Sequence, residues 1–279
     1  MENLQVEKNI EKAKEALNLA EAVLITAGAG MGVDSGLPDF RGKEGFWRAY
    51  PYTQKLGLSF QDLANPKWFK VDPYLAWAFY GHRLNLYRNT QPHKGFYLLR
   101  DFLRKKGDNY FIFTSNVDGQ FQKAGFDENR IVEIHGSIHY LQCVDPCSDD
   151  IWSAENTFVE VDMDNFKAKD PLPRCINCGG IARPNILMFG DFSFIPDRVE
   201  SQEFRLNLWL ERNQNKKMVI IEIGARESVP TVRWFGERIS RDYSATLIRI
   251  NPRDYSVPHS IDAISIPLTG LKALESLLK

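Results

Sequence analysis

Five short apolar runs rich in β-branched and aromatic residues occur along this chain, and each ends in a glycine or polar motif. Helical patterns separate many of them, notably over 92–106 and 199–212. Continuous apolar strands that alternate with helices favour a parallel sheet covered by helices on both faces. Since such a sheet binds ligands at the carboxyl ends of its strands, we expect the five motifs to meet in one crevice. The runs lie at 22–25, 110–113, 131–134, 218–223 and 245–250.

Two segments do not follow this alternation. Residues 46–90 are aromatic-rich and mostly helical in pattern, and 139–183 are polar, irregular and contain every cysteine. We interpret them as a helical module and a zinc-binding module that together form a smaller inserted domain. The predicted fold class is therefore α/β, with a Rossmann-like sheet domain made of 1–45, 91–138 and 184–279.

Composition excludes several classes of protein. The formal net charge of -1 gives no bulk attraction to nucleic acid or to a membrane surface. The first 21 residues form a charged, amphipathic helical pattern rather than a signal peptide. We expect a cytoplasmic protein without nucleic-acid or membrane partners, in which cysteines are thiols or metal ligands rather than disulfides.

The cysteines form two close pairs, Cys143-x3-Cys147 and Cys175-x2-Cys178, with glycines after the second pair. Four thiolates at this spacing suit one tetrahedral zinc ion with no open position, and such an ion is structural. The alternative, four ordinary thiols, is disfavoured because the pairs lie in a polar segment that is poorly suited to a core.

The stretch 26–42 carries the densest chemistry. Glycines directly after a strand let backbone N–H groups approach a phosphate, although a glycine-rich turn without a ligand has the same local pattern. Two acids, a proline, an aromatic residue and an arginine follow the glycines. This combination indicates a site that both holds a dinucleotide and reacts with it.

Taken together, the motifs resemble those of the sirtuins, the NAD-dependent protein deacylases. The resemblance rests on ordered segments from Gly28 to Asn251, which is most of the chain. They are Gly28-Ala29-Gly30, Ser35-Gly36-Leu37-Pro38-Asp39-Phe40-Arg41, Thr114-Ser115-Asn116-Val117-Asp118, His135-Gly136, the cysteine pairs and Arg183-Pro184-Asn185 through Phe189-Gly190-Asp191.

The resemblance implies removal of acyl groups from lysine side chains of proteins, with nicotinamide and O-acyl-ADP-ribose as products. Catalysis falls to His135, as general base on a ribose hydroxyl, and to Asn116 and Asp118 at the nicotinamide end. A histidine suits this role because its ordinary pKa lies near neutrality. The implied NAD contacts are Gly28, Ala29, Gly30, Asp39, Phe40, Arg41, Ser115, Asn116, Asp118, His135, Gly224, Ala225 and Asn251.

Some positions depart from the family pattern. Gly32 and Ser115 replace a serine and a glutamine, and Asp191 replaces a glutamate. Gly224-Ala225-Arg226 replaces Gly-Thr-Ser and adds a cation. These departures leave open ADP-ribosyl transfer to a protein or plain NAD hydrolysis at the same site. A non-catalytic NAD sensor is a further alternative, which the retained Asn116 and His135 disfavour.

The acyl preference also has a motif. Tyr80 and Arg83 are three residues apart and share a helix face, as in sirtuins that remove succinyl and malonyl groups. A phenol and a guanidinium can together bind a distal carboxylate, although a packed tyrosine beside a solvated arginine has the same spacing. The resemblance adds Phe189 and Gly190 as substrate contacts. His82, His93, His139 and His259 lie in no comparable motif.

Overall fold

The computed structural model describes residues 2–38 and 42–279. Its 3-10 helices are η1 (Ala29–Met31), η2 (Val33–Ser35) and η3 (Glu128–Arg130). The α-helices are α1 (Glu2–Leu19), α2 (Gly42–Ala49), α3 (Pro51–Lys55), α4 (Phe60–Leu63), α5 (Trp68–Val71), α6 (Pro73–Asn89), α7 (Lys94–Lys105), α8 (Gln120–Lys123), α9 (Asp197–Arg212), α10 (Thr231–Tyr243) and α11 (Gly270–Leu278). The strands are β1 (Ala22–Ala27), β2 (Tyr110–Thr114), β3 (Ile131–Glu133), β4 (Gly136–Cys143), β5 (Trp152–Ser153), β6 (Val161–Asp162), β7 (Lys167–Ala168), β8 (Ala182–Ile186), β9 (Met218–Ile223), β10 (Thr246–Ile250) and β11 (Ala263–Ile266).

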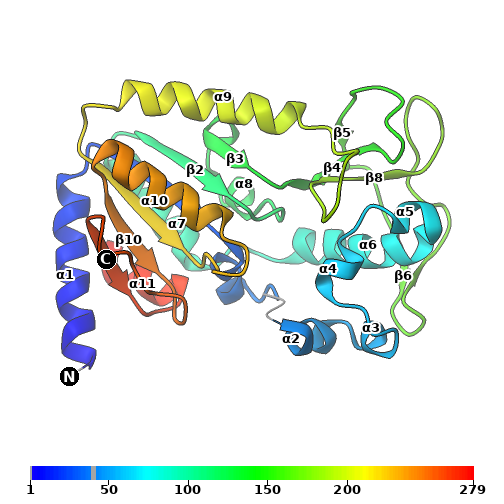
Figure 1. Cartoon of the computed structure of the whole chain (residues 1–279), viewed down its shortest axis with the longest axis horizontal. Helices are drawn as coiled ribbons and strands as arrows, with labels where there is room; N and C mark the ends of the chain where they lie inside the picture. The colour runs from blue at the N-terminus through cyan, green and yellow to red at the C-terminus, as the bar shows by residue number, and fades with distance from the viewer. Residues whose placement is uncertain (1, 39–41) are drawn as a thin grey trace.

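The predicted parallel sheet is confirmed. In the described part of the chain it has six strands in the order β11-β10-β9-β1-β2-β3, all parallel (Figure 1). Alternate residues of each strand point to opposite faces, so apolar runs such as β1 are buried on both. Helices α1, α7 and α11 pack on one face, and α9 and α10 cover the other.

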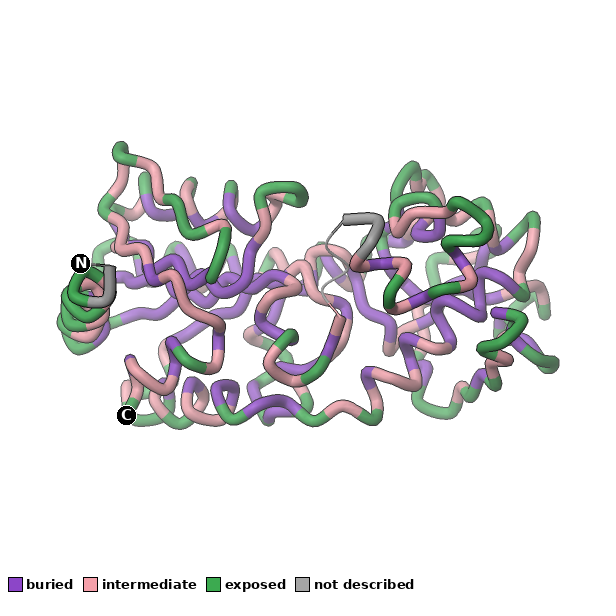
Figure 2. Tube along the Cα trace, turned by 90° about the horizontal axis from the view of Figure 1, so that it is seen from below, coloured by how far each residue is buried: buried purple, intermediate pink, exposed green. Residues whose placement is uncertain are grey.

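A separate hydrophobic cluster lies outside this sheet. It joins helices α2 to α6 with strands β4 to β8 and is rich in aromatic side chains such as Phe46, Tyr50 and Trp77. We call 46–90 and 139–183 the small region and the remainder the sheet region. Figure 2 shows buried segments concentrated in both, with partly buried segments between them. Strands β4 and β8 pair antiparallel and cross the expected boundaries at 138/139 and 183/184.

The predicted N-terminal amphipathic helix is confirmed as α1, and the helix expected to begin at Pro73 is α6. Within the residues that the structure describes, no helix combines the length and the apolar character needed to cross a bilayer.

Candidate active site

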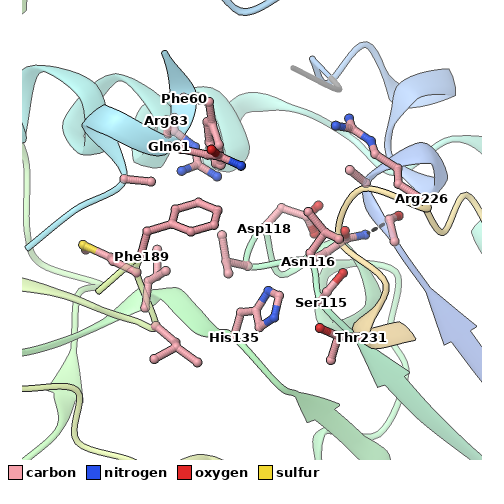
Figure 3. A pocket seen from close by; sticks show the side chains of 18 of the residues that line it. Phe60, Gln61, Arg83, Ser115, Asn116, Asp118, His135, Phe189, Arg226 and Thr231 are labelled. Atoms are coloured by element: carbon pink, nitrogen blue, oxygen red, sulfur yellow. Dashed lines mark hydrogen bonds between the residues drawn. The ribbon is translucent and has the colours of Figure 1, made fainter. Parts of the chain in front are cut away.

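A cavity of about 670 Å³ opens at the carboxyl ends of β1, β2, β3 and β9. Ala29, Asn116, His135 and Ala225 reach it from the sheet region, while the small region contributes Tyr80 and Arg83. Figure 3 shows Asn116 and Asp118 at its centre, between Arg83 and Arg226, with His135 beneath them. The predicted convergence of strand-end motifs therefore occurs for β1, β2, β3 and β9.

The glycines after β1 and β9 bring two backbones into direct contact. The N–H groups of Gly28 and Gly30 donate to the carbonyls of Ile223 and Gly224, each at 3.0 Å. A Cβ on Gly30 would lie 2.6 Å from the Cα of Gly224, which itself has a left-handed φ of 65°. Both amides are thus engaged within the protein, and the glycines bring the backbone of Gly28 and Ala29 to the cavity wall.

The loop after Gly30 is held by residues distant in sequence. Asp34 Oδ2 accepts a hydrogen bond from the Leu271 N–H at 2.8 Å, at the start of α11. His93 Nε2 lies 3.0 Å from the Met31 carbonyl, and the His93 N–H donates to Ser35 Oγ. These contacts fix the loop against α7 and α11.

Asn116 and Asp118 occupy the turn after β2. Thr114 Oγ1 donates to the Ala27 carbonyl and accepts the N–H of Asn116, and Asn116 Nδ2 donates to the Gly28 carbonyl at 3.0 Å (Figure 3). Asp118 Oδ1 accepts the Gln120 N–H at 2.9 Å. Burial raises the pKa of Asp118 to about 6 against the opposing effect of that N–H, so this carboxylate is poorly solvated and takes up a proton more readily than an exposed one.

His135 lies just beyond β3, where Gly136 begins β4. Gly136 has a φ of 77°, and a Cβ there would lie 2.1 Å from the Asn185 carbonyl oxygen, so only glycine permits this approach to β8. Burial lowers the pKa of His135, partly offset by the Ser115 backbone. A neutral imidazole facing a cavity can accept a proton from a substrate hydroxyl.

Tyr80 and Arg83 line the side of the cavity formed by α6. Arg83 is only 6% exposed, donates to the Tyr87 hydroxyl from Nε and Nη2, and lies over the rings of Phe79 and Tyr87. The Tyr80 hydroxyl is buried and, across residues 2–38 and 42–279, meets no hydrogen-bond partner. Burial raises its pKa to about 12.

The four cysteine sulfurs cluster within 4.8 Å of one another. The Cys143–Cys178 and Cys147–Cys175 pairs are separated by 3.7 and 3.6 Å between Sγ atoms. Four thiolates at ordinary Zn–S distances around one ion would be about 3.8 Å apart. The donor set and its spacing therefore fit one closed, structural zinc ion, and Gly180 leaves room beside the Cys178 sulfur.

The remaining predicted site residues divide between the cavity wall and places outside it. Asn251 is buried behind the cavity wall, where its Nδ2 donates to the Ala225 carbonyl at 2.7 Å and its Oδ1 accepts two backbone N–H groups. Gly190 follows Phe189 in the same turn with a left-handed φ of 65°, and Phe189 lines the cavity. Asp39, Phe40 and Arg41 lie outside the described residues.

Several lining residues were absent from the expected site. Arg226, Phe60, Gln61 and Thr231 all border the cavity (Figure 3). For Arg226 the sequence held a signal, since a cation directly follows the glycine motif after β9. Phe60 and Gln61 carry none, because only the packing of the small region brings α4 to the cavity.

A model of the Sir2 family matches residues 28–224, about seven tenths of the chain. The chain belongs to the Sir2 family. The matched span of this sirtuin contains the loop 28–36, which we call the glycine loop, and also Asn116, Asp118, His135 and the cysteine cluster, and it ends at Gly224.

Individual relatives agree with this assignment. An NAD-dependent protein deacylase of Leptospira interrogans is 31% identical over 88% of this chain and 87% of its own length. An NAD-dependent protein deacetylase of Saccharolobus solfataricus is 33% identical over 65% of each chain. A solved Sir2 homologue in complex with NAD superposes with a TM-score of 0.68 at 25% identity, covering 96% of this sirtuin and 92% of that chain.

Proposed function

We propose that this sirtuin removes acyl groups from lysine side chains of proteins, with NAD as co-substrate and with nicotinamide and O-acyl-ADP-ribose as products. The observation that carries the proposal is the meeting of Asn116, Asp118 and His135 with the glycine loop in one cavity of a Sir2-family chain. The names of its relatives, NAD-dependent protein deacylases and a deacetylase, support it.

In this proposal NAD supplies an electrophilic ribose carbon, and the chain orients it. Ala29, supported by Gly28 and Gly30, holds the pyrophosphate beside Gly224 and Ala225. Asn251 contributes by fixing the Ala225 carbonyl. Asn116 and Asp118 bind the nicotinamide end, with Asp118 accepting from the carboxamide. Ser115 lies beside them in the NAD site, where it is too short to make the ribose contact of the glutamine that it replaces. The same assignment gives Asp39, Phe40 and Arg41 contacts to the nicotinamide ribose.

The acyl oxygen of the modified lysine would displace nicotinamide from the ribose carbon. His135 would then take the proton of a ribose hydroxyl as that oxygen adds to the imidate carbon, and water would release the free lysine and leave the acyl group on ADP-ribose. The lowered pKa supports this role, because the ring is neutral near pH 7 and can act as a base. The backbone carbonyl of His135 accepts the Leu187 N–H at 2.9 Å. This hydrogen bond fixes the backbone of His135 against the segment that leads to Phe189.

We also propose that Tyr80 and Arg83 recognise an acidic acyl group such as succinyl or malonyl. The unpartnered Tyr80 hydroxyl supports this, since a buried hydroxyl without a partner is costly and gains one from a carboxylate. The buried Arg83 guanidinium, which also lines the cavity, supplies the charge.

The protein substrate would enter between an NAD domain (1–45, 91–138 and 184–279) and a small domain (46–90 and 139–183). Phe189 and Gly190 would contact the peptide, which pairs mainly through its backbone. The exposed side chains of Leu187 and Phe189 near the cavity suit this role. Free cysteines suited to zinc support a cytoplasmic location.

Nicotinamide release from NAD tests the proposal, with acetyl- and succinyl-lysine peptides and without peptide. We expect release that requires an acyl peptide, is faster with the succinyl form, and is lost in His135→Ala. The matched control is His259→Ala, because His259 is an exposed histidine outside the cavity. Nicotinamide release at the same rate with and without acyl peptides would contradict deacylation and favour NAD hydrolysis or ADP-ribosyl transfer.

A further inference from the structure

His139, on β4, contacts the Asp118–Gly119 turn from the side that faces away from the main cavity. His139 lines another cavity, of about 410 Å³, which we call the rear cavity, and Asp118 and Tyr87 border this cavity and the main cavity alike. The pairing register of β4 with β8 shifts between Ser137 and Leu141, so His139 lies in an irregular part of the strand.

The imidazole of His139 contacts the turn in two ways. Its Nε2 lies 2.9 Å from the Asp118 carbonyl oxygen. Because a carbonyl can only accept, Nε2 must carry the proton and donate it. The ring also lies directly over Gly119, where an added Cβ would lie 2.7 Å from His139 Cδ2. Gly119 has a left-handed φ of 70°, so the absence of a side chain serves the turn and the ring contact together.

We propose that His139 is a positioning residue that holds Asp118 in the orientation that binds the nicotinamide carboxamide. The backbone of Asp118 is held from behind by the imidazole, and its carboxylate is held by the Gln120 N–H. Loss of the imidazole donor would release the backbone and let the carboxylate turn with it. The inference rests on the proposed NAD site, because Asp118 has this role only there.

Burial keeps the ring of His139 in the neutral form that this role needs, because it is the largest influence on the pKa of His139 and lowers it. The Asp118 carbonyl and Glu133 favour protonation of the ring, whereas Arg88 and Arg198 oppose it. A neutral ring has one N–H, which the Asp118 carbonyl accepts.

The experiment compares two ligands that differ at the nicotinamide end. The dissociation constants of NAD and of ADP-ribose are measured by calorimetry for the wild type, His139→Phe, His139→Gln and the exposed control His259→Phe. We expect His139→Phe to weaken NAD binding about tenfold, as for loss of one hydrogen bond, and to leave ADP-ribose binding unchanged. Glutamine retains an amide donor, so His139→Gln should stay within about threefold of the wild type for both ligands.

Steady-state kinetics should show the same selectivity, with a higher KM for NAD and a kcat within about threefold of the wild type. Equal weakening of NAD and ADP-ribose, or no weakening of either, would overturn the proposal. If His139→Phe does not fold, His139→Ala, which removes the same donor without adding bulk, should give the same NAD-selective loss. A wild type that binds NAD without turning it over would refute the deacylase activity and leave the binding test of His139 intact.

Discussion

The sheet region and the small region each bury an arginine, and they use it in opposite ways. Arg249, on β10, is fully buried and engaged by two carboxylates, Glu222 through Nε and Nη2 and Glu237 at 2.7 Å. Arg83, on α6, is nearly as buried, but it donates to a phenol, lies over aromatic rings and lines the cavity. Similar burial therefore accompanies two different surroundings, two carboxylates for Arg249 and a phenol, aromatic rings and the cavity for Arg83.

The surroundings of the two arginines also differ, since Arg249 lies in a row of polar side chains and Arg83 lies among aromatic rings. Thr26, Glu222 and Arg249 lie side by side in the register of β1, β9 and β10, beneath α10. Gly236 lets that helix approach, since a Cβ there would already lie 3.4 Å from Glu222 Oε2. The sheet region thus has an internal polar row, whereas the small region combines an aromatic cluster with the cysteine site.

Zinc removal should separate the regions most strongly. We expect a chelator to unfold the small region and abolish activity, because structural zinc contributes roughly 10 kcal/mol or more to such sites. Hydrogen exchange should then remain slow in β1, β9 and β10 while the amides of β4 and β8 become exposed. Equal exposure of both regions would show that they fold as one unit.

Arg249→Met should have the next largest effect. It leaves Glu222 and Glu237 beside an apolar side chain, and breaking a buried ion pair costs about 3–5 kcal/mol. Urea unfolding measures the loss, with Arg241→Met on the exposed side of α10 as control. A change near zero would mean that the polar row is not what stabilises this sheet.

Arg83→Met should change selectivity. Loss of a charge-assisted hydrogen bond to an acyl carboxylate lowers kcat/KM for a succinyl-lysine peptide by roughly 10- to 100-fold. Activity on an acetyl-lysine peptide should change little. Arg88→Met is the matched control, since Arg88 lies on the same helix and donates to the Ala154 and Thr157 carbonyls. Parallel losses on both peptides would remove the contrast with Arg249.

Acid should lower the stability of both regions modestly. Burial lowers the pKa of His93 in the sheet region and of His82 in the small region. Below about pH 6.5 the two histidines are protonated in the unfolded chain but not yet in the folded chain. The free energy of unfolding therefore has its full contribution from these histidines above that pH and loses it as the pH falls. His93→Gln keeps a donor for the Met31 carbonyl, and thermal unfolding at pH 7.5 and 5.5 should show a smaller acid effect than in the wild type. A His259→Gln control with the same reduction would exclude His93 as the cause.

The fold was predictable because its strands are continuous apolar runs. Both faces of such strands must be buried, and a parallel sheet covered by helices on both faces buries them. The cysteine site was predictable for a similar local reason, since ligand spacing lies in the sequence itself. Some helix boundaries differ by a few residues from those expected, because capping side chains decide where a helix begins. The helix expected from Pro92 begins at Lys94, since His93 caps it.

Long-range contacts limited prediction of the site. Asn251 follows a strand end like the other motifs, but its side chain is used within the protein by Ala225 and two backbone amides. Asp191, noted as a shorter replacement for glutamate, forms a fully buried ion pair with Arg183 and accepts the Ser193 N–H. Neither use is visible in spacing along the chain, because the partners meet only in the folded protein.

The tie between Asp34 and Leu271 has a consequence for local unfolding. The two residues are 237 positions apart in the sequence, yet the Leu271 N–H at the start of α11 donates to Asp34 Oδ2 in the loop after Gly30. Local opening of α11 would therefore remove one anchor of this loop without unfolding the sheet. Conversely, any ligand that binds only the closed loop should slow hydrogen exchange in α11, far along the chain from the loop itself.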